Sequence, residues 1–544
     1  LLQPYGNARV ALTVAENMQP YTVDILNQFG KGFFWMLFFG TMVLFYETIN
    51  HFNKREKIIL SFGFIIFFTG FVFSRWSSTS IFNGTNFVSQ AFYFGTMILF
   101  FITLAKVYMK NSKEENKTPE LLNLNYSYIF ILSLTLLMYL ASKGAIRLLF
   151  ISAPVFTVLV AFLPVVLFSY YRKAKDDLWK ICLIVLILLC AFFFVTTFIS
   201  YEKSTLGSTR ATVPSIYDIH WQNAMSWVRE NTDKNSIFVH WWDYGYWVQT
   251  IGQRPTVVDG GHLIGYWDHL IGRYLLTTPY PETALSLMKT YGVSYLLIDS
   301  TDIGKYPAYS KIGSNEEGFD RFSSIPTFVQ DQAQSKKDAN YSTSVYSGSS
   351  AYVDEDIKYE NGGNEIFLPE NKAAIVGIIT NTPNNQIISQ PTLVFLYNGK
   401  QVNIPSRYAY YNGKIIDFGE GIDSIVYFFP YLQQSSASGV SINLVGSAMY
   451  ISPKVSKGLF AELYLLDDSF DKYPTIKLAH LEDDPLVKDL NTQGANIGHF
   501  VYYNGLRAPI KIWKIDYPQN IITREEFFRT DGSYGEFDNL TFTR

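Results

Sequence analysis

The chain has 544 residues and a formal net charge of −3, and 48% of its residues are hydrophobic, 17% aromatic and 17% charged. The near-neutral charge argues against a nucleic-acid partner. The two cysteines, Cys182 and Cys190, stand in one apolar run, which excludes a disulfide framework and argues against a thiolate metal site. Such a mixture of apolar and charged residues suits an apolar part joined to a polar part.

Six apolar segments precede residue 203. Most are long enough, with their flanks, to cross the roughly 30 Å hydrocarbon core of a lipid bilayer. They are Phe33–Tyr46, Ile58–Phe73, Phe87–Tyr108, Tyr128–Leu140, Leu148–Tyr170 and Leu178–Ile199. The first and fourth are marginal in length, and each has a buried helix as its alternative. We therefore expect a membrane region of about six helices.

The loops between these segments predict their orientation. Those after the first, third and fifth segments carry lysines and arginines, which are typical of cytoplasmic loops. These residues are Lys54, Arg55, Lys57, Lys110, Lys113, Lys117, Arg172, Lys173 and Lys175, with Glu114, Glu115 and Glu120 offsetting the third loop. The loop Trp76–Asn86 has no charged residue, which suits the outside. Six crossings then leave both flanks of the membrane region extracytoplasmic.

After Tyr201 the apolar runs become shorter and polar residues more common. The pattern predicts helices at Ile219–Glu230 and Pro281–Tyr291 and strands at Ser236–His240, Thr256–Asp259 and Ser294–Asp299. Helices that alternate with short apolar strands favour an α/β core.

The last part of the chain is predicted to be rich in β-structure. Thr392–Tyr397, Arg407–Tyr411 and Val501–Tyr503 each run into Asn-Gly, a dipeptide that forms tight hairpin turns. The preceding polar, serine-rich stretch is interpreted as a surface insertion. The expected parts are an external loop segment (1–31), a transmembrane region (32–200), an α/β core (201–317), a polar insertion (318–360) and one or more β-rich peripheral domains (361–544).

One motif directly follows the predicted strand Ser236–His240. It is Trp241-Trp242-Asp243-Tyr244-Gly245. Ligands of α/β folds sit at the carboxyl ends of strands, and indole N–H groups with a carboxylate can hold a small hydroxyl group. The alternative is an aromatic plug that closes the domain against the membrane.

This pentapeptide resembles the signature of archaeal-type oligosaccharyltransferase catalytic subunits, and the flanking stretch Tyr246–His262 also resembles archaeal members. The resemblance implies a membrane enzyme that transfers a glycan from a lipid-phosphate or lipid-diphosphate carrier onto asparagine in Asn-X-Ser/Thr acceptors. It also implies that Trp241, Trp242 and Asp243 bind the Ser or Thr hydroxyl of the acceptor polypeptide.

Two weaker matches concern the membrane region. Thr13-Val14-Ala15-Glu16 resembles an external-loop motif whose glutamate binds a divalent metal, which would make Glu16 a catalytic residue and a ligand of Mn²⁺ or Mg²⁺. The loop that follows is one residue longer than usual, and a solvated glutamate is the alternative. Arg147 opens the fifth segment where the family has an arginine that contacts the lipid diphosphate. Its alternative is a snorkelling arginine, and Lys143 is a weaker candidate nearby.

A third match lies in the soluble part. Asp302-Ile303-Gly304-Lys305 resembles an archaeal Asp-x-x-Lys motif that lies beside the pentapeptide, so Asp302 and Lys305 become candidates for acceptor binding. Asp299 is a rival for the aspartate. The family usually has Met or Ile where Tyr309 stands, so the apolar contact to the acceptor could differ. A solvated charged loop is the alternative.

Leu1 is not methionine, and we interpret the chain as amino-terminally truncated. The resemblance implies further metal-binding carboxylates in the missing part, so we expect the fragment alone to be inactive. Another membrane glycosyltransferase, such as a protein O-mannosyltransferase, remains an alternative, as does a non-enzymatic adhesin anchored by helices. A zinc hydrolase using His262 and His269 is disfavoured because the two histidines are separated by two helical turns.

Overall fold

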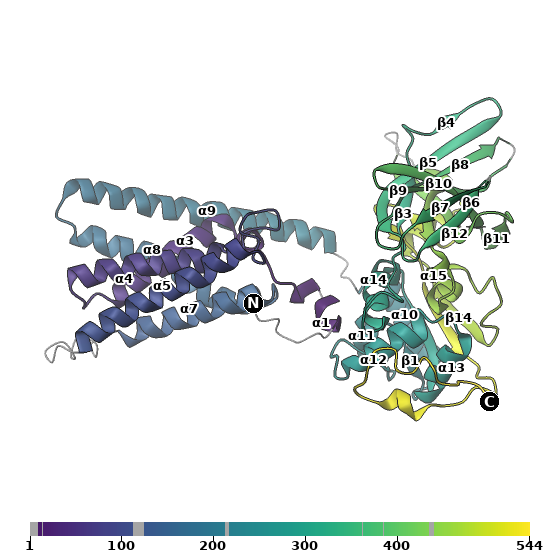
Figure 1. Ribbon diagram of the computed structural model, residues 1–544, viewed down its shortest axis with the longest axis horizontal. Helices are drawn as coiled ribbons and strands as arrows, with labels where there is room; N and C mark the ends of the chain where they lie inside the picture. Colours follow the sequence, from purple (N-terminus) through teal and green to yellow (C-terminus); the bar gives the residue numbers. More distant parts are fainter. Residues whose placement is uncertain are drawn as a thin grey trace. The chain divides into compact units, whose positions relative to one another are not determined.

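The computed structural model describes residues 9–13, 15–112, 125–212, 217–361, 363–384, 386–434 and 440–544. Its backbone contacts divide the chain into two units, Leu1–Val213 and Pro214–Arg544. The first unit is helical and the second combines helices with sheets (Figure 1).

The first unit contains the predicted apolar segments as helices. Its described helices are α1 (Arg9–Thr13), α2 (Thr22–Phe29), α3 (Lys31–Thr48), α4 (Lys54–Phe73), α5 (Phe87–Ser112), α7 (Tyr126–Gly144), α8 (Leu148–Lys173) and α9 (Asp177–Thr212). By length and composition α4, α5, α7, α8 and α9 could each cross a membrane, and α2 with α3, which bend by 110°, could form a sixth span. This confirms a multi-pass membrane region. Of the two marginal segments, the fourth (in α7) could span a membrane by itself, whereas the first (in α3) could do so only together with α2.

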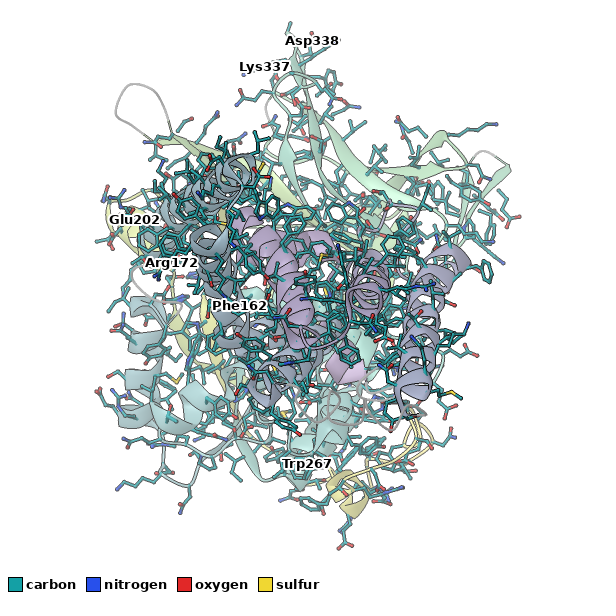
Figure 2. All side chains as sticks on the ribbon, turned by 90° about the vertical axis from the view of Figure 1, so that its left-hand side faces the viewer. Phe162, Arg172, Glu202, Trp267, Lys337 and Asp338 are labelled. Carbon is teal, nitrogen blue, oxygen red and sulfur yellow. The ribbon has the colours of Figure 1, made fainter. Side chains whose placement is uncertain are left out.

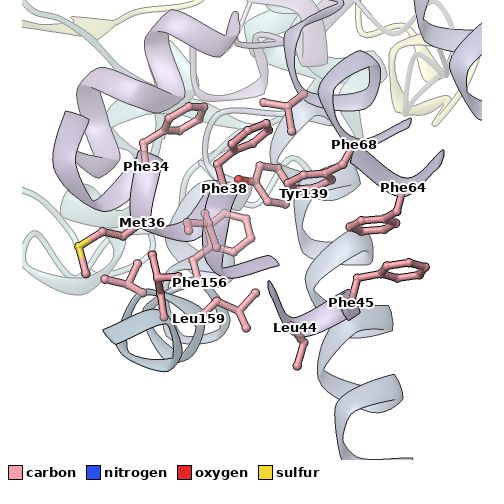
Figure 3. Close-up of a cluster of buried hydrophobic side chains, with 14 of the residues drawn as sticks. Phe34, Met36, Phe38, Leu44, Phe45, Phe64, Phe68, Tyr139, Phe156 and Leu159 are labelled. Carbon is pink, nitrogen blue, oxygen red and sulfur yellow. The ribbon is translucent and has the colours of Figure 1, made fainter. Parts of the chain in front are cut away.

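Aromatic rings fill the interior of the helix bundle (Figure 3). Phe45 of α3 stacks on Phe64 of α4 with ring centroids 4.0 Å apart. Phe68, also on α4, stacks on Phe38 of α3 and meets Tyr139 of α7 edge to face. Because lipid tails are as apolar as these rings, close packing rather than burial from water holds such helices together.

The second unit contains a mixed four-stranded sheet with helices around it. Its strands have the order β1 (Ile237–Val239), β2 (Val293–Ile298), β17 (Ile510–Ile515) and β14 (Ile476–Glu482). Strands β1 and β2 are parallel, and the other pairs are antiparallel. The helices of the unit are α10 (Ile219–Asn231), α11 (Gly245–Thr250), α12 (Gly265–Ile271), α13 (Pro281–Thr290), α14 (Thr301–Gly313), α15 (Pro453–Ser456) and α16 (Pro485–Thr492). The core is therefore mixed, and two of its strands come from the end of the chain.

A larger, mostly antiparallel sheet with two parallel pairs forms most of the remainder. Its strands are β3 (Thr327–Gln330), β4 (Lys336–Lys337), β5 (Tyr341–Tyr352), β8 (Ala374–Pro383), β9 (Thr392–Tyr397), β10 (Lys400–Tyr411), β11 (Lys414–Asp417), β12 (Ile422–Gln434), β13 (Val440–Ile451), β15 (Val501–Tyr502) and β16 (Leu506–Arg507). Strands β6 (Ile357–Asn361) and β7 (Asn364–Leu368) form a separate pair. The main path is β11-β10-β9-β8-β5-β3-β13-β12-β15-β16, and β10 also pairs with β12, so part of the sheet closes on itself.

The three predicted Asn-Gly hairpins are present. They connect β9 to β10, β10 to β11 and β15 to β16. Their asparagines, Asn398, Asn412 and Asn504, have φ angles of 50°, 50° and 53°, and the following glycines are also left-handed. Two-residue turns require such angles, and the first two hairpins have turns of this length, whereas three residues join β15 to β16.

Three predictions about boundaries in the chain were wrong. Residues 318–360 are not a surface insertion, because β5 pairs with β8 inside the large sheet and buries Tyr346. Alternating Ser and Thr disguised this strand, and the tip of the β4–β5 hairpin, at Lys337 and Asp338, is the part that projects (Figure 2). Thr256–Asp259 makes a single bridge to Phe238, since the chain turns at Asp259. Helix α9 continues past residue 200 to Thr212.

Candidate functional site

The Trp-Trp-Asp motif occupies the turn that follows β1. Trp242–Tyr244 form one 3-10 turn that leads into α11. Trp241 is buried and packs on the ring of Tyr309, with centroids 5.5 Å apart. Tyr309 therefore lies against the motif, where its buried ring supports the first indole. Trp242 and Asp243 remain partly exposed.

The glycine that ends the motif allows a second segment to approach. A Cβ at Gly245 would lie 2.4 Å from the Cβ of Asp259 and 2.8 Å from the carbonyl oxygen of Val258. Neither backbone could yield that space cheaply, so a side chain at this position would push the segments apart. The turn around Asp259 is thereby held directly against the start of α11.

A chain of polar contacts connects the motif to α14. The Nζ of Lys305 lies 3.2 Å from Oδ2 of Asp243 and donates to the Tyr244 hydroxyl at 3.0 Å. That hydroxyl in turn donates to Oδ1 of Asp302 at 2.9 Å. Lys305 thus fixes the Asp243 carboxylate, and Tyr244 connects Lys305 to the buried Asp302.

The two candidate aspartates, Asp299 and Asp302, are both buried. The burial of Asp302 does not fit the acceptor-binding role that was expected of it. Asp302 is 2% exposed, and its carboxylate accepts from the Tyr244 hydroxyl at 2.9 Å and from the backbone N–H of Asp299 at 3.1 Å. Burial raises the pKa of Asp302 to about 7, against the opposing effect of Lys305. Asp299 is equally buried and lies 3.4 Å from the Tyr244 hydroxyl. Asp302 supports Tyr244 from the interior, whereas Asp299, although buried, lines the same pocket as Asp243 and Lys305.

This pocket beside the motif has a volume of about 550 Å³. Asp243, Tyr244 and Lys305 line one side of it. The β15–β16 hairpin lines another side, with Arg507 held 3.1 Å from Asp484. The pocket therefore combines the motif with a hairpin far away in the sequence.

The residue before the motif is a neutral histidine. His240 is fully buried, its Nδ1 donates to the carbonyl of Trp241 at 2.7 Å, and burial lowers its pKa to about 4. It therefore stabilises the turn without adding charge to the site.

A second cluster lies within the first unit. The backbone N–H of Arg147 donates to the carbonyl of Glu16 at 3.1 Å, and Ile146 donates to Met18 at 3.0 Å. The side chains of Glu16 and Arg147 are exposed and line an open pocket of about 500 Å³. The rest of the lining is mainly apolar: Gln28, Phe29, Phe33, Ile146, Leu149, Phe150, Ala153, Thr157 and Tyr201. Val14 of the matched motif lies outside the described residues.

Lys143 does not join this cluster. Helix α7 ends at Gly144 and α8 begins at Leu148, so Lys143 and Arg147 are not on one helical face. The Nζ of Lys143 donates to the carbonyl of Phe71 and lies 3.4 Å from the Ser74 hydroxyl. This lysine ties α7 to α4 instead.

Comparisons with known proteins relate the chain to one group of enzymes. It is 34% identical over 95 residues to dolichyl-phosphooligosaccharide-protein glycotransferase 1 of Pyrococcus furiosus, which is 17% of this chain and 10% of that protein. It is 29% identical over 101 residues to a dolichyl-diphosphooligosaccharide--protein glycosyltransferase subunit of Oryza sativa, 17% of this chain and 14% of that protein. These stretches of the chain are similar to oligosaccharyltransferases.

A solved oligosaccharyltransferase of Archaeoglobus fulgidus, tethered to an acceptor peptide, covers 85% of this chain and 56% of its own at 13% identity and a TM-score of 0.34. No family model matches the chain. The matched stretches span a small fraction of the curated relatives, a tenth of the Pyrococcus protein. The activity and substrates of this protein are therefore proposals.

The described residues do not complete a metal site. Glu16 supplies one carboxylate, and among the described ranges of the chain no group of three or more His, Cys, Asp or Glu is placed to hold a metal ion. Mg²⁺ and Mn²⁺ favour about six oxygen ligands. His262 and His269 do not approach a common centre either, because their Nδ1 atoms bond to Asp268 and to the carbonyl of Ile312.

Sequence reasoning missed the side of the pocket that the β15–β16 hairpin forms. The Asn504-Gly505 turn signalled the hairpin, but no local pattern predicted that Arg507 would lie near Asp243. Strand β17, which follows the hairpin, pairs with β2. This pairing brings the end of the chain to the edge where the motif lies.

Proposed function

We propose that this protein transfers an oligosaccharide from a lipid-phosphate or lipid-diphosphate carrier to the asparagine amide of Asn-X-Ser/Thr segments. The observation that carries the proposal is the Asp243 carboxylate, which Lys305 holds and which lines a pocket of about 550 Å³, with the partly exposed Trp242 as its neighbour in the chain. The sequence similarity to oligosaccharyltransferases supports it and gives no support to an O-mannosyltransferase.

Asp243 and Trp242 would bind the acceptor hydroxyl. A Ser or Thr hydroxyl donates one hydrogen bond and accepts others, whereas a carboxylate only accepts and an indole N–H only donates. Asp243 accepts from the hydroxyl and the indole donates to it. An acceptor with alanine at this position would leave the polar groups of the site unpaired, so the site rejects it.

The pocket beside Glu16 and Arg147 would bind the donor. A guanidinium group forms strong, charge-assisted hydrogen bonds with phosphate oxygens. The apolar lining below Arg147, including Phe33 and Leu149, suits the hydrocarbon chain of a lipid carrier. This combination of one cation and an apolar groove is what a lipid phosphate needs.

In the reaction, the amide nitrogen of asparagine bonds to the anomeric carbon while the bond from that carbon to the phosphate oxygen breaks. The nitrogen loses a proton, and the lipid phosphate leaves with the electron pair. A carboxylate at Glu16 would hold the amide N–H groups and weaken their conjugation with the carbonyl. Arg147 would stabilise the charge on the departing phosphate.

A divalent ion, Mn²⁺ or Mg²⁺, would stabilise the same developing negative charge. Glu16 would be one of its ligands, and the other ligands would come from outside the described residues. The arrangement also requires Glu16 and Asp243 on the extracytoplasmic side of the membrane, as the charges of the loops predict.

Peptide binding to the full chain in detergent tests the acceptor site. We expect a peptide containing Asn-Ala-Thr to bind at least tenfold more tightly than one containing Asn-Ala-Ala, because one unpaired buried hydrogen bond costs about 1–3 kcal/mol. Asp243→Ala should abolish this difference. Equal affinity of the unaltered protein for both peptides would contradict the proposal and favour a glycosyltransferase that does not read a hydroxyl.

A further inference from the structure

The second tryptophan of the motif rests against a histidine from another segment. The rings of Trp242 and His262 meet at an interplanar angle of 67°, with centroids 4.4 Å apart. Such edge-to-face contacts restrict how an aromatic side chain can rotate. The orientation of the Trp242 indole therefore depends on the position of His262.

A buried carboxylate holds the histidine. Nδ1 of His262 donates to Oδ2 of Asp268 at 2.8 Å. The Asp268 side chain is 2% exposed and that of His262 is 24% exposed. Burial raises the pKa of Asp268, and the hydrogen bond from His262 acts against this rise. The ring of His262 is therefore held by the buried Asp268 while it contacts Trp242.

The backbone at His262 has an unusual conformation for its residue type. Its φ angle is +48°, a left-handed value that non-glycine residues adopt rarely and that persists where the surroundings enforce it. Asp259 enforces the turn, because its carboxylate accepts from the backbone N–H of Gly261 and from the side chain of Gln249, both at 2.8 Å. Gln249 lies on α11, directly after the motif.

We propose that His262 is a positioning residue for acceptor recognition. Its ring holds the Trp242 indole in the orientation that binds the Ser or Thr hydroxyl, and Asp268 holds the ring. The inference rests on the proposed function of Trp242 and Asp243. His262 lies outside the pentapeptide. The turn Asp259–His262 contacts the motif at both ends, because Asp259 packs against Gly245 and His262 packs against Trp242.

The substitution His262→Asn distinguishes the role of the histidine ring from the role of the backbone turn. Asparagine tolerates the left-handed conformation and can still donate to Asp268, but it has no ring to place against Trp242. In the full chain in detergent, we expect the variant to bind the Asn-Ala-Thr peptide about fivefold more weakly, the size of an edge-to-face contact. Affinity for the Asn-Ala-Ala peptide and the midpoint of thermal unfolding should stay unchanged.

The chain offers a matched control. Nδ1 of His499 lies 2.7 Å from Oδ1 of Asp483 on the same unit, and no ring contact joins it to the motif among the described residues. His499→Asn should bind both peptides as the unaltered protein does. Unchanged Asn-Ala-Thr affinity in His262→Asn, or an equal loss for both peptides with a lower unfolding midpoint, would overturn the proposal.

A second measurement does not depend on peptide binding. Iodide quenching of tryptophan fluorescence should increase in His262→Asn, because the indole gains freedom, and this increase should disappear when Trp242→Phe is added. If the increase occurs but the unaltered protein does not discriminate between the peptides, the proposed function fails while the contact stands. If no increase occurs, His262 does not position Trp242.

Discussion

The two candidate clusters are built in different ways. In the second unit, the Asp243 carboxylate is fixed by Lys305, and behind it stand Tyr244 and the buried Asp302. In the first unit, Glu16 is held through its backbone carbonyl by Arg147, and its side chain is exposed. The contrast fits a division of labour in which a preorganised site reads the acceptor. The less constrained Glu16 carboxylate would then gain its partners from the substrates and from residues outside the described ones.

Tyr244→Phe should give the largest loss and tests whether the second cluster is preorganised. The variant removes the hydroxyl that accepts from Lys305 and donates to the buried Asp302. Two charged partners lose a hydrogen bond, so we expect the free energy of unfolding to fall by about 3 kcal/mol. Chemical unfolding followed by fluorescence measures this loss. Tyr246→Phe, at a neighbouring tyrosine that is 51% exposed, is the control and should change stability by less than about 0.5 kcal/mol.

The pH dependence of stability should expose two opposing groups in the second unit. Burial lowers the pKa of His240 to about 4, below its unfolded value of about 6.5. The unfolded chain therefore binds a proton that the folded chain refuses, and stability falls as pH drops from about 7 toward 4. Burial raises the pKa of Asp302 to about 7, so the folded chain binds the extra proton there and stability rises over the same interval.

Asp302→Asn separates these effects. Between pH 7 and pH 5 each group contributes about 2 kcal/mol with opposite sign. The unaltered protein should therefore show little change from this pair, whereas the variant should lose about 2 kcal/mol more than the unaltered protein on acidification. Unfolding by urea at both pH values gives the comparison. Identical pH dependence of the two proteins would show that Asp302 is already ionised in the folded state.

Arg147→Ala tests the donor pocket of the first unit. We expect affinity for a short isoprenyl phosphate to fall about tenfold, since a charge-assisted hydrogen bond to phosphate is lost. The corresponding isoprenyl alcohol should bind both proteins equally. Arg172→Ala removes an arginine at the opposite end of α8 and should leave phosphate affinity unchanged. If both substitutions weakened phosphate binding equally, Arg147 would act only through its positive charge and not as a specific phosphate ligand.

Glu16→Gln should have the smallest effect on stability and so sharpens the contrast between the clusters. The side chain is exposed, and the hydrogen bond from Arg147 goes to the backbone. We expect thermal unfolding to shift by less than the equivalent of about 0.5 kcal/mol. A large destabilisation would mean that the Glu16 side chain is a structural element rather than a carboxylate available to substrates.

Local patterns in the sequence predicted the helices and the hairpins, whereas the proximity of two motifs was implied by the family resemblance and is explained by the sheet. Trp241–Asp243 and Asp302–Lys305 follow β1 and β2, which are parallel neighbours, and the carboxyl ends of parallel strands lie at one edge of a sheet. Repeating apolar runs and Asn-Gly turns are local signals, so they could be recognised without tertiary information.

Other features depended on contacts between distant segments. Asp302 was expected at the surface, but its burial under Tyr244 follows from packing that its own neighbours in sequence do not encode. Strand β5 was mistaken for an insertion because it is rich in Ser and Thr and buries Tyr346 only where it pairs with β8 inside the sheet. His262 was also missed as part of the site, because its ring contacts Trp242, which lies twenty residues earlier in the chain.

Labelling with a membrane-impermeant thiol reagent tests most directly whether the carboxylate at Glu16 and the indole turn at Asp243 can serve one reaction. Single cysteines would replace Met18 and Tyr246, both exposed neighbours of these residues, in a chain without Cys182 and Cys190. We expect both sites to react in intact cells. Reaction of one site in intact cells, with the other reacting only after the membrane is opened, would place the two clusters on opposite sides and contradict the proposal.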